Sequence, residues 1–398
     1  MFIPRDISKD IEKTAQSMPI IGIFGPRQSG KSTLAKKIFS KHAYVNFEDI
    51  ETRMNAEKDG KYFLLEYANE YGIIIDEAQR VPDIFSYIQV VSDENPRPGY
   101  FILTGSQNYL LMQSISQSLA GRIALFTLLP FSIHELKSKL LPNEYETCIF
   151  TGFYPSIIAE KKDPTMWYKN YISTYVERDV RQLINVSQLS NFRKFMGLCA
   201  GRIGQLLNFS SLANDCGISV NTVKSWLSIL ETSYIIFLLQ PHHKNFNKRL
   251  IKSPKLFFYD PGLACSILGI KNEKEIMHHY LRGGLFETMM ISDLYKNYYN
   301  AGDTPSIYFW RDQTGNEIDC LIAEGMHLYP IEIKASKTMN SDFFKGVDYW
   351  NQLAHGKPEN SYVIYEGEKK FTSSQGTFMP WNQTDTIFEK IVPLNKAS

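Results

Sequence analysis

The chain has 398 residues, 43% of them hydrophobic, and its 43 Lys and Arg side chains almost balance 42 Asp and Glu side chains. This length exceeds what one hydrophobic core usually holds, so we expect two or three domains. With a formal net charge of +1, the protein does not attract nucleic acid over its whole surface. Any contact with nucleic acid must therefore come from local basic patches.

Cysteine usage and hydropathy predict a cytoplasmic protein without a membrane partner. The five cysteines are scattered and form no C-x-x-C pair, which is typical of buried thiols in a reducing compartment. No apolar run approaches the roughly 20 residues that span a bilayer.

The first predicted element is a strand over residues 21–24 that runs into a phosphate-binding loop. The pattern G-x-x-x-x-G-K-S is formed by Gly25, Pro26, Arg27, Gln28, Ser29, Gly30, Lys31 and Ser32, and we expect the next residue, Thr33, to belong to the nucleotide site as well. In this pattern backbone N–H groups hold phosphate oxygens, the lysine reaches the β and γ phosphates, and the hydroxyl of Ser32 binds Mg²⁺. We therefore expect a nucleotide, ATP or ADP, and Mg²⁺ as cofactors, although the motif does not specify the base.

A second apolar stretch, residues 71–75, ends in the acids Asp76 and Glu77. Alternation along a strand points neighbouring side chains in different directions, which gives the two acids separate tasks. Asp76 is predicted to complete the Mg²⁺ site, and Glu77 to polarise the attacking water as general base.

Residues 43–47, 100–107 and 122–126 are further strand candidates, so strands alternate with helices. This alternation predicts an α/β domain with a parallel sheet and its ligand at the carboxyl ends of the strands. Ser106 or Gln107 would then sense the γ-phosphate, or else cap a turn. Arg122 is either a cation for the transition state, from this subunit or from a neighbour in a homo-oligomer, or a surface arginine.

The motifs Gly-Pro-Arg-Gln-Ser-Gly-Lys-Ser-Thr, Ile-Asp-Glu-Ala-Gln and Leu-Thr-Gly-Ser-Gln resemble those of AAA-type ATPases that carry a C-terminal domain of unknown function, the AAA_14 and DUF4143 combination. The resemblance continues through residues 175–180, 252–255 and 260–263. It implies an AAA-type fold and ATP hydrolysis, but no settled biological role.

Residues 209–227 have helix-turn-helix spacing, with Gly217 at the turn and Ser219 as the cap of the second helix. The positions expected to be exposed carry one cation, Lys224, so the second helix either contacts DNA or is a structural spacer. A basic run follows, which is either a phosphate-contacting strip or a solvated loop. Its cations are Lys244, Lys248, Arg249, Lys252 and Lys255.

The C-terminal part contains Glu287, Asp319, and the pair Glu332 and Lys334. Glu332 and Lys334 lie two apart in a predicted strand and so share one face, and a hairpin would bring Asp319 beside them. This order resembles the PD-(D/E)XK endonuclease fold, which implies that Glu287, Asp319 and Glu332 bind Mg²⁺ and that Lys334 stands near the nucleophile. The alternative is a solvated strand face with alternating Glu and Lys.

Together these patterns predict three domains: an AAA-type P-loop ATPase domain at 1–145, a helical, winged-helix-like domain at 146–250, and an α/β endonuclease-like domain at 251–398. The expected function is ATP hydrolysis that gates a Mg²⁺-dependent nuclease acting on DNA. The alternative is an ATP-dependent switch whose C-terminal domains bind partners without cleaving nucleic acid.

Overall fold

The structure is a computed structural model that describes residues 1–106, 118–137, 140–176, 189–242 and 251–392. The chain forms two compact units. Unit 1 comprises residues 1–131, 232–234 and 298–303, and unit 2 comprises residues 132–231, 235–297 and 304–398. The predicted boundaries at residues 145 and 250 stay a prediction. Within the described ranges, no helix combines the length and the apolar composition that a membrane span requires.

Unit 1 is built on a parallel sheet of five strands in the order β2-β3-β4-β1-β5, which confirms the predicted α/β sheet. The strands are β1 (Ile20–Gly25), β2 (Ala43–Asn46), β3 (Ile73–Asp76), β4 (Phe101–Ser106) and β5 (Ile123–Thr127). Strands β1 and β3 are buried along their whole length, as expected for central parallel strands that are covered on both faces.

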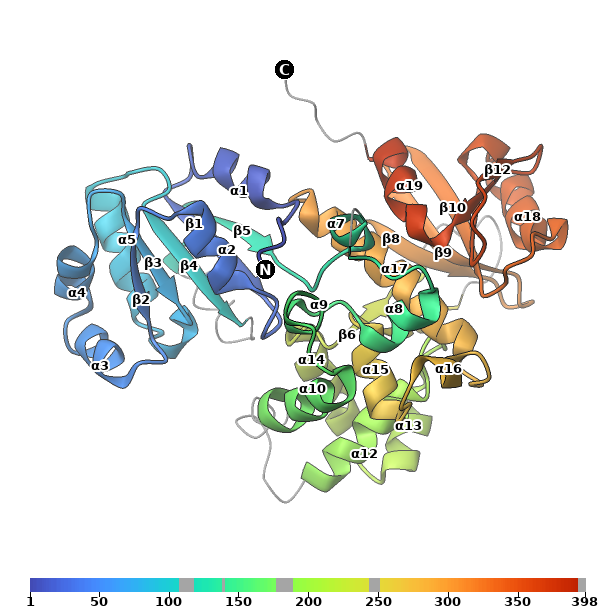
Figure 1. Ribbon diagram of the computed structural model, residues 1–398, viewed down its shortest axis with the longest axis horizontal. Helices are drawn as coiled ribbons and strands as arrows, with labels where there is room; N and C mark the ends of the chain where they lie inside the picture. The colour runs from blue at the N-terminus through green and yellow to red at the C-terminus, as the bar shows by residue number, and fades with distance from the viewer. Residues whose placement is uncertain (107–117, 138–139, 177–188, 243–250, 393–398) are drawn as a thin grey trace. The chain divides into compact units, whose positions relative to one another are not determined.

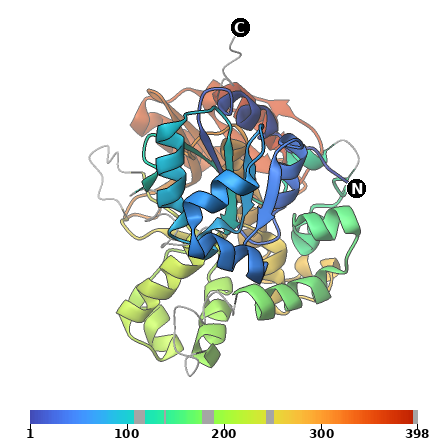
Figure 2. The same ribbon diagram turned by 90° about the vertical axis from the view of Figure 1, so that its left-hand side faces the viewer.

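Helices cover both faces of this sheet (Figures 1 and 2). Helices α1 (Ser8–Thr14) and α2 (Lys31–Ile38) share one hydrophobic cluster with the strands. Helices α3 (Ile50–Lys58), α4 (Gly60–Tyr67) and α5 (Ile84–Glu94) share the other. A short 3-10 turn, η1 (Ala78–Arg80), follows β3. The sheet is thus fixed from both sides, and the carboxyl ends of β1, β3 and β4 form one edge.

Unit 2 begins with helices. These are α7 (Ile133–Leu136), α8 (Tyr145–Thr151), α9 (Pro155–Glu160), α10 (Pro164–Tyr171), the π-helical η2 (Ile172–Val176), α12 (Leu189–Ala200), α13 (Phe209–Cys216), α14 (Val220–Thr232), α15 (Pro261–Leu268) and α16 (Glu273–Ile276). Strands β6 (Ile236–Leu239) and β7 (Lys255–Phe258) form an antiparallel pair.

The predicted helix-turn-helix segment has the expected local structure. Gly217 ends α13 in the left-handed conformation, with φ of 78°. The Ser219 hydroxyl accepts a hydrogen bond of 3.1 Å from the backbone N–H of Thr222 and so caps α14.

The C-terminal half of unit 2 contains a six-stranded sheet in the order β12-β13-β11-β10-β9-β8. Its strands are β8 (Ile307–Arg311), β9 (Glu317–Glu324), β10 (His327–Lys334), β11 (Tyr362–Tyr365), β12 (Phe371–Thr372) and β13 (Thr377–Pro380). The helices around it are α17 (Arg282–Asn300), η4 (Ser341–Phe344), α18 (Lys345–Ala354), η5 (Pro358–Asn360), η6 (Trp381–Gln383) and α19 (Thr384–Ile391).

Two pairings in this sheet matter for the second site. Strands β9 and β10 form an antiparallel hairpin with Cys320 opposite Ile331, which confirms the predicted pairing. Strand β11 runs parallel to β10, with η4, α18 and η5 in the connection. The side chains of Phe344, Trp350 and Trp310 join α18 and η4 to one face of the sheet.

Candidate functional site

The phosphate-binding loop connects β1 to α2, where the predicted glycines have the backbone conformations that the motif requires. Gly25 and Gly30 have φ of 153° and 93°. A Cβ on Gly25 would collide with the backbone oxygen of Leu128, so only glycine fits there. The buried Lys31 donates a hydrogen bond of 2.7 Å from Nζ to the oxygen of Pro26, and its ammonium group therefore lies over the loop.

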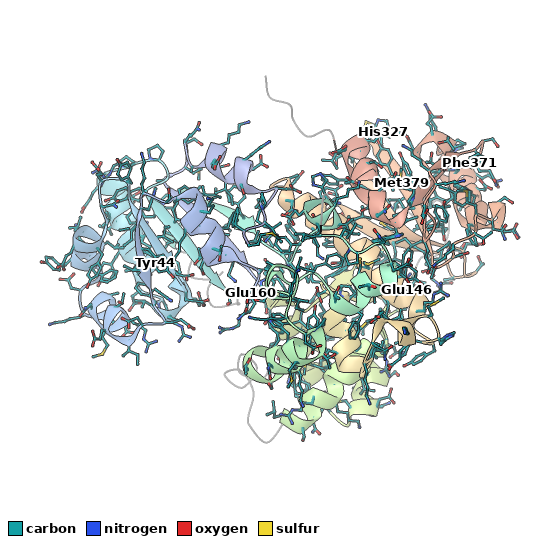
Figure 3. The ribbon with its side chains drawn as sticks, in the orientation of Figure 1. Tyr44, Glu146, Glu160, His327, Phe371 and Met379 are labelled. Atoms are coloured by element: carbon teal, nitrogen blue, oxygen red, sulfur yellow. The ribbon has the colours of Figure 1, made fainter. Side chains whose placement is uncertain are left out.

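Asp76 is the centre of the polar network at the edge of the sheet. Its carboxylate is 2.9 Å from the hydroxyl of Ser32, so the structure brings the two predicted Mg²⁺ ligands together. Thr104 of β4 donates to the same carboxylate oxygen as Ser32. The other oxygen accepts a hydrogen bond of 2.8 Å from Tyr44, a β2 residue labelled in Figure 3. Burial and the neighbouring Asp76 raise the pKa of Tyr44, which keeps the phenol protonated as a donor.

The residues at this edge fit the phosphates of a nucleotide with Mg²⁺. The hydroxyl oxygens of Ser29 and Ser106 are buried and have no hydrogen-bond partner in the described parts of the chain, which is unusual for polar atoms in a folded protein. Ser106 ends β4 in register with Gly25, the last residue of β1, and Ser29 lies in the loop that follows β1. The loop would hold the phosphates, and Ser32 and Asp76 would hold Mg²⁺, which neutralises charge that develops on the phosphates.

The predicted general base, Glu77, follows β3 directly. Its backbone is left-handed, with φ of 56°, and its carboxylate accepts a hydrogen bond from the side-chain amide of Gln79. Residues other than glycine rarely adopt this conformation, and those that do are often found at active sites. Gln107 lies outside the described residues, so its role as a sensor of the γ-phosphate stays a prediction.

Arg122 does not lie near the phosphate-binding loop of its own chain. The adjacent Ile123 is in register with Ile20 at the amino-terminal end of β1, about 16 Å along the strand from Gly25 at a rise of roughly 3.3 Å per residue. Its guanidinium binds Asp93 of α5 at 2.5 and 2.8 Å. The interpretation of Arg122 as a cation for its own nucleotide is therefore wrong, and a role in a neighbouring subunit stays a prediction.

Arg5 is a residue of this site that the sequence motifs do not reveal. Its buried guanidinium donates 3.0 Å and 2.7 Å hydrogen bonds to the backbone oxygens of Ser29 and Leu129, and it lies over the ring of Phe131. The N-terminal segment thus supports the phosphate-binding loop from outside the motif. Only the distance in sequence, more than a hundred residues between Arg5 and Leu129, hides this contact.

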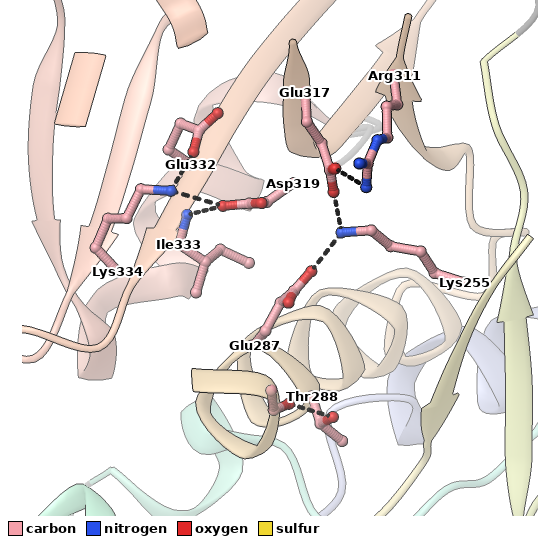
Figure 4. Close-up of polar contacts among 10 residues, drawn as sticks. Lys255, Glu287, Thr288, Arg311, Glu317, Asp319, Glu332, Ile333 and Lys334 are labelled. Carbon is pink, nitrogen blue, oxygen red and sulfur yellow. Dashed lines mark hydrogen bonds and ion pairs between the residues drawn. The ribbon is translucent and has the colours of Figure 1, made fainter. Parts of the chain in front are cut away.

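A second polar cluster lies in unit 2 (Figure 4). The carboxylate of Asp319 accepts hydrogen bonds from the backbone N–H of Ile333 at 2.9 Å and from Lys334 at 3.2 Å. Lys334 also pairs with Glu332. The hairpin of β9 and β10 therefore brings the predicted Asp319, Glu332 and Lys334 together.

Glu287 of α17 stands apart from Glu332 and pairs with a different lysine. Lys255 is 3.1 Å from Glu287 and also binds Glu317, which in turn accepts from Arg311 at 2.9 Å. Lys255 is only 3% exposed, so its prediction as part of a surface strip for nucleic acid is wrong. Lys252 is exposed, and Lys244, Lys248 and Arg249 lie outside the described residues.

The carboxylates of this cluster do not gather around one position that a metal could take. Within the described ranges, no group of three or more His, Cys, Asp or Glu side chains is placed to hold a metal ion. Glu332 packs under α18, where a Cβ on Gly346 would be 2.7 Å from its Oε1. Glu287, Asp319 and Glu332 each bind a lysine instead, so this arrangement does not fit the predicted Mg²⁺ site.

The charges in the cluster shift one another's ionisation. Burial and the nearby Asp319 raise the pKa of Glu332 well above its ordinary value. Burial acts to raise the pKa of Asp319, but the positive charges of Lys334 and Lys255 outweigh it, so this pKa lies below its ordinary value. Burial alone would lower the pKa of Lys255, and the surrounding Glu287, Asp319 and Glu317 raise it instead.

Comparison with known proteins gives three family matches. Residues 17–137 match an AAA domain family, AAA_14, and residues 142–274 and 282–384 match two domains of unknown function, DUF8612 and DUF4143. The uncharacterized proteins Rv2008c of Mycobacterium tuberculosis and Mb2031c of Mycobacterium bovis are each 28% identical to this chain over 373 residues, which cover 93% of it and 81% of the relative.

Solved structures show weaker similarity. The Walker-type ATPase PABY2304 of Pyrococcus abyssi has a TM-score of 0.45 and 15% identity, over 67% of this chain and 96% of the other. The RuvB Holliday junction branch migration motor of Thermotoga maritima has a TM-score of 0.32 and 16% identity, over 59% of this chain and 90% of the other. The match of residues 17–137 to an AAA domain family, together with the phosphate-binding loop, supports ATP binding and hydrolysis by this part of the chain.

The ionisation of Glu287 predicts how stability depends on pH. Burial, opposed by Lys255, raises the pKa of Glu287 from 4.5 to about 7. The folded state therefore keeps a proton that the unfolded chain has released, so this contribution to stability is complete below pH 4.5 and is lost as the pH rises through about 7. As the pH rises through this interval, we expect the free energy of unfolding of the wild type to fall by about 1–3 kcal/mol more than that of Glu287→Gln.

Urea unfolding of both proteins at several pH values measures this difference. The exposed Glu359, changed to Gln, is the control and should unfold like the wild type at every pH. Equal pH dependence of the wild type and Glu287→Gln would contradict the assignment.

Proposed function

We propose that this protein is an ATP hydrolase whose nucleotide state acts as a switch for unit 2. The single observation that carries the proposal is the 2.9 Å contact between Ser32 and Asp76 with Glu77 as the next residue. Hydroxyl and carboxylate oxygens are the ligands that Mg²⁺ prefers, and a carboxylate that follows them is in place to accept a proton from the attacking water. Lys31, buried over the loop, is the cation for the phosphates.

The second cluster favours a switch over a nuclease. Its acids are balanced by Lys255, Lys334 and Arg311, and Glu332 is buried under α18. A nuclease of the predicted type needs carboxylates that are open to a metal and to a phosphodiester. The order α17, antiparallel β8-β9-β10, α18 and parallel β11 supports an endonuclease-like fold, and we propose that this fold is retained as an interaction module.

Nucleic acid is the partner class that a further observation favours. Helices α13 and α14 precede the strand pair β6 and β7, and Leu206 forms a bridge to Lys255 at the edge of that pair, which supports a winged-helix-like arrangement. The second helix of such a motif meets a nucleic acid groove with its exposed side chains. The exposed side chains of α14 include Asn221, Lys224, Ser225 and Ser228.

ATP turnover with Mg²⁺ tests the ATPase. We expect Glu77→Gln to lower kcat by about 10²–10⁴-fold and to leave nucleotide affinity nearly unchanged, because it removes the proton acceptor and preserves shape. Lys31→Ala should instead abolish binding of a fluorescent ATP analogue. Glu94→Gln, an exposed α5 residue paired with Lys61, is the matched control and should behave like the wild type. Turnover by Glu77→Gln at the wild-type rate would refute the assignment of the base.

Fluorescence anisotropy with a duplex DNA at several salt concentrations tests the nucleic-acid partner. We expect Lys224→Glu to weaken binding and to reduce the slope of log K against log salt by about 1, because one phosphate contact is lost. The same change at Lys274, which is exposed on α16, should leave the slope unchanged. Binding that is absent in the wild type, or equal in both variants, would contradict a DNA contact by α14.

Incubation of the same preparation with supercoiled plasmid, ATP and Mg²⁺ or Mn²⁺ distinguishes the switch from a nuclease. The paired carboxylates predict that the plasmid stays intact with the wild type and with the double variant Glu332→Ala/Lys334→Ala. Nicking by the wild type that is lost in the double variant would establish a nuclease and overturn the non-cleaving interpretation.

A further inference from the structure

Gln79 lies between the proposed general base and the end of the neighbouring strand. Its side-chain nitrogen donates a hydrogen bond to the carboxylate of Glu77. Its side-chain oxygen is buried and has no hydrogen-bond partner among the residues that the structure describes. That oxygen lies against Gly105 of β4, where a Cβ would overlap it. The amide of Gln79 is therefore confined on one side by Glu77 and on the other by β4.

The backbone brings the two side chains together. Glu77 precedes the 3-10 turn η1 in a left-handed conformation. Its backbone carbonyl oxygen accepts a 3.0 Å hydrogen bond from the backbone N–H of Arg80. This tight turn places Gln79 two residues further on and back over Glu77. A left-handed conformation is unfavourable for a glutamate, so the surrounding contacts must stabilise it.

The orientation of the amide shows which contact dominates. With the opposite orientation, the oxygen of Gln79 would face the Glu77 carboxylate, and two acceptors would repel each other. The observed orientation gives a charge-assisted hydrogen bond to Glu77 and leaves the other end of the amide unpaired against Gly105. The contact with Glu77 therefore outweighs the loss of a partner for a buried oxygen.

The neighbouring strand connects this contact to the phosphate site. Thr104, which precedes Gly105, donates to Asp76, and Ser106, which follows it, is in register with Gly25 of the loop. Gln79 thus contacts β4 at the residue between the Mg²⁺ network and the phosphate cradle. Among the residues that the structure describes, the side-chain amide of Gln79 donates to Glu77 and not to that network.

We propose that Gln79 is a positioning residue that holds the Glu77 carboxylate in the orientation needed to accept a proton. This inference rests on the proposed ATPase function. Misplacement of a reacting group by about 1 Å can cost on the order of 10²-fold in rate, so a residue that fixes the base acts on kcat and not on nucleotide binding. Gln79 acts through Glu77 alone.

The variant Gln79→Met tests the proposal, because methionine is similar in length and has no amide. We expect kcat for ATP to fall by about 10- to 100-fold, with KM and the affinity for a non-hydrolysable ATP analogue within about twofold of the wild type. In Gln79→Glu, which places a carboxylate against Glu77, kcat should fall by at least as much. The matched control is Gln89→Met on α5, which should keep wild-type kcat.

The double variant Glu77→Gln/Gln79→Met gives the sharper result. If Gln79 acts through Glu77, the second change costs nothing more in kcat once the base is lost. Additive losses, an unchanged kcat in Gln79→Met, or a loss that appears in KM and thermal stability instead would each overturn the inference. If Glu77→Gln alone turns over ATP like the wild type, the proposed base is wrong. If Glu77→Gln is inactive and Gln79→Met is normal, only the role of Gln79 is wrong.

Discussion

The carboxylate of Asp76 is the interaction on which the nucleotide site depends. A buried charge is tolerated only when its oxygens are hydrogen-bonded, and Asp76 is 5% exposed. Its donors are the hydroxyls of Ser32, Tyr44 and Thr104, which come from α2, β2 and β4. One residue therefore ties the phosphate-binding loop to two strands. Because a hydroxyl can also serve as a metal ligand, the same contacts are suited to receive Mg²⁺.

The charge cluster of unit 2 follows a different principle. Its acids are neutralised by lysines from the protein itself, and each ion pair is partly or fully removed from water. Such pairs are costly to desolvate and are best regarded as fixing a particular packing. Lys255 connects β7 to α17 and β9, and Lys334 connects β10 to β9. The cluster thus holds the sheet, α17 and the strand pair together.

The two incorrect residue assignments have clear physical reasons. Arg122 precedes a strand, and in a parallel sheet the residue before a strand lies at the edge opposite to the ligand. The run that contains Lys255 has the composition of an exposed strip, but Lys255 is the first residue of β7 and finds two carboxylates there. Neither carboxylate is near it in the sequence, so no local pattern indicates the burial.

By itself, the sequence determined the phosphate-binding loop, the five strands of unit 1, the paired acids at Asp76 and Glu77, and the hairpin that joins Asp319 to Glu332. These features depend on periodicity and on short motifs whose partners lie within one or two neighbouring elements. Tertiary structure alone decided the support of the loop by Arg5, the donation by Tyr44 to Asp76, and the pairing of Glu287 and Glu332 with different lysines. These contacts join residues far apart in the chain, and their formation depends on how helices and strands pack, which composition and spacing do not specify.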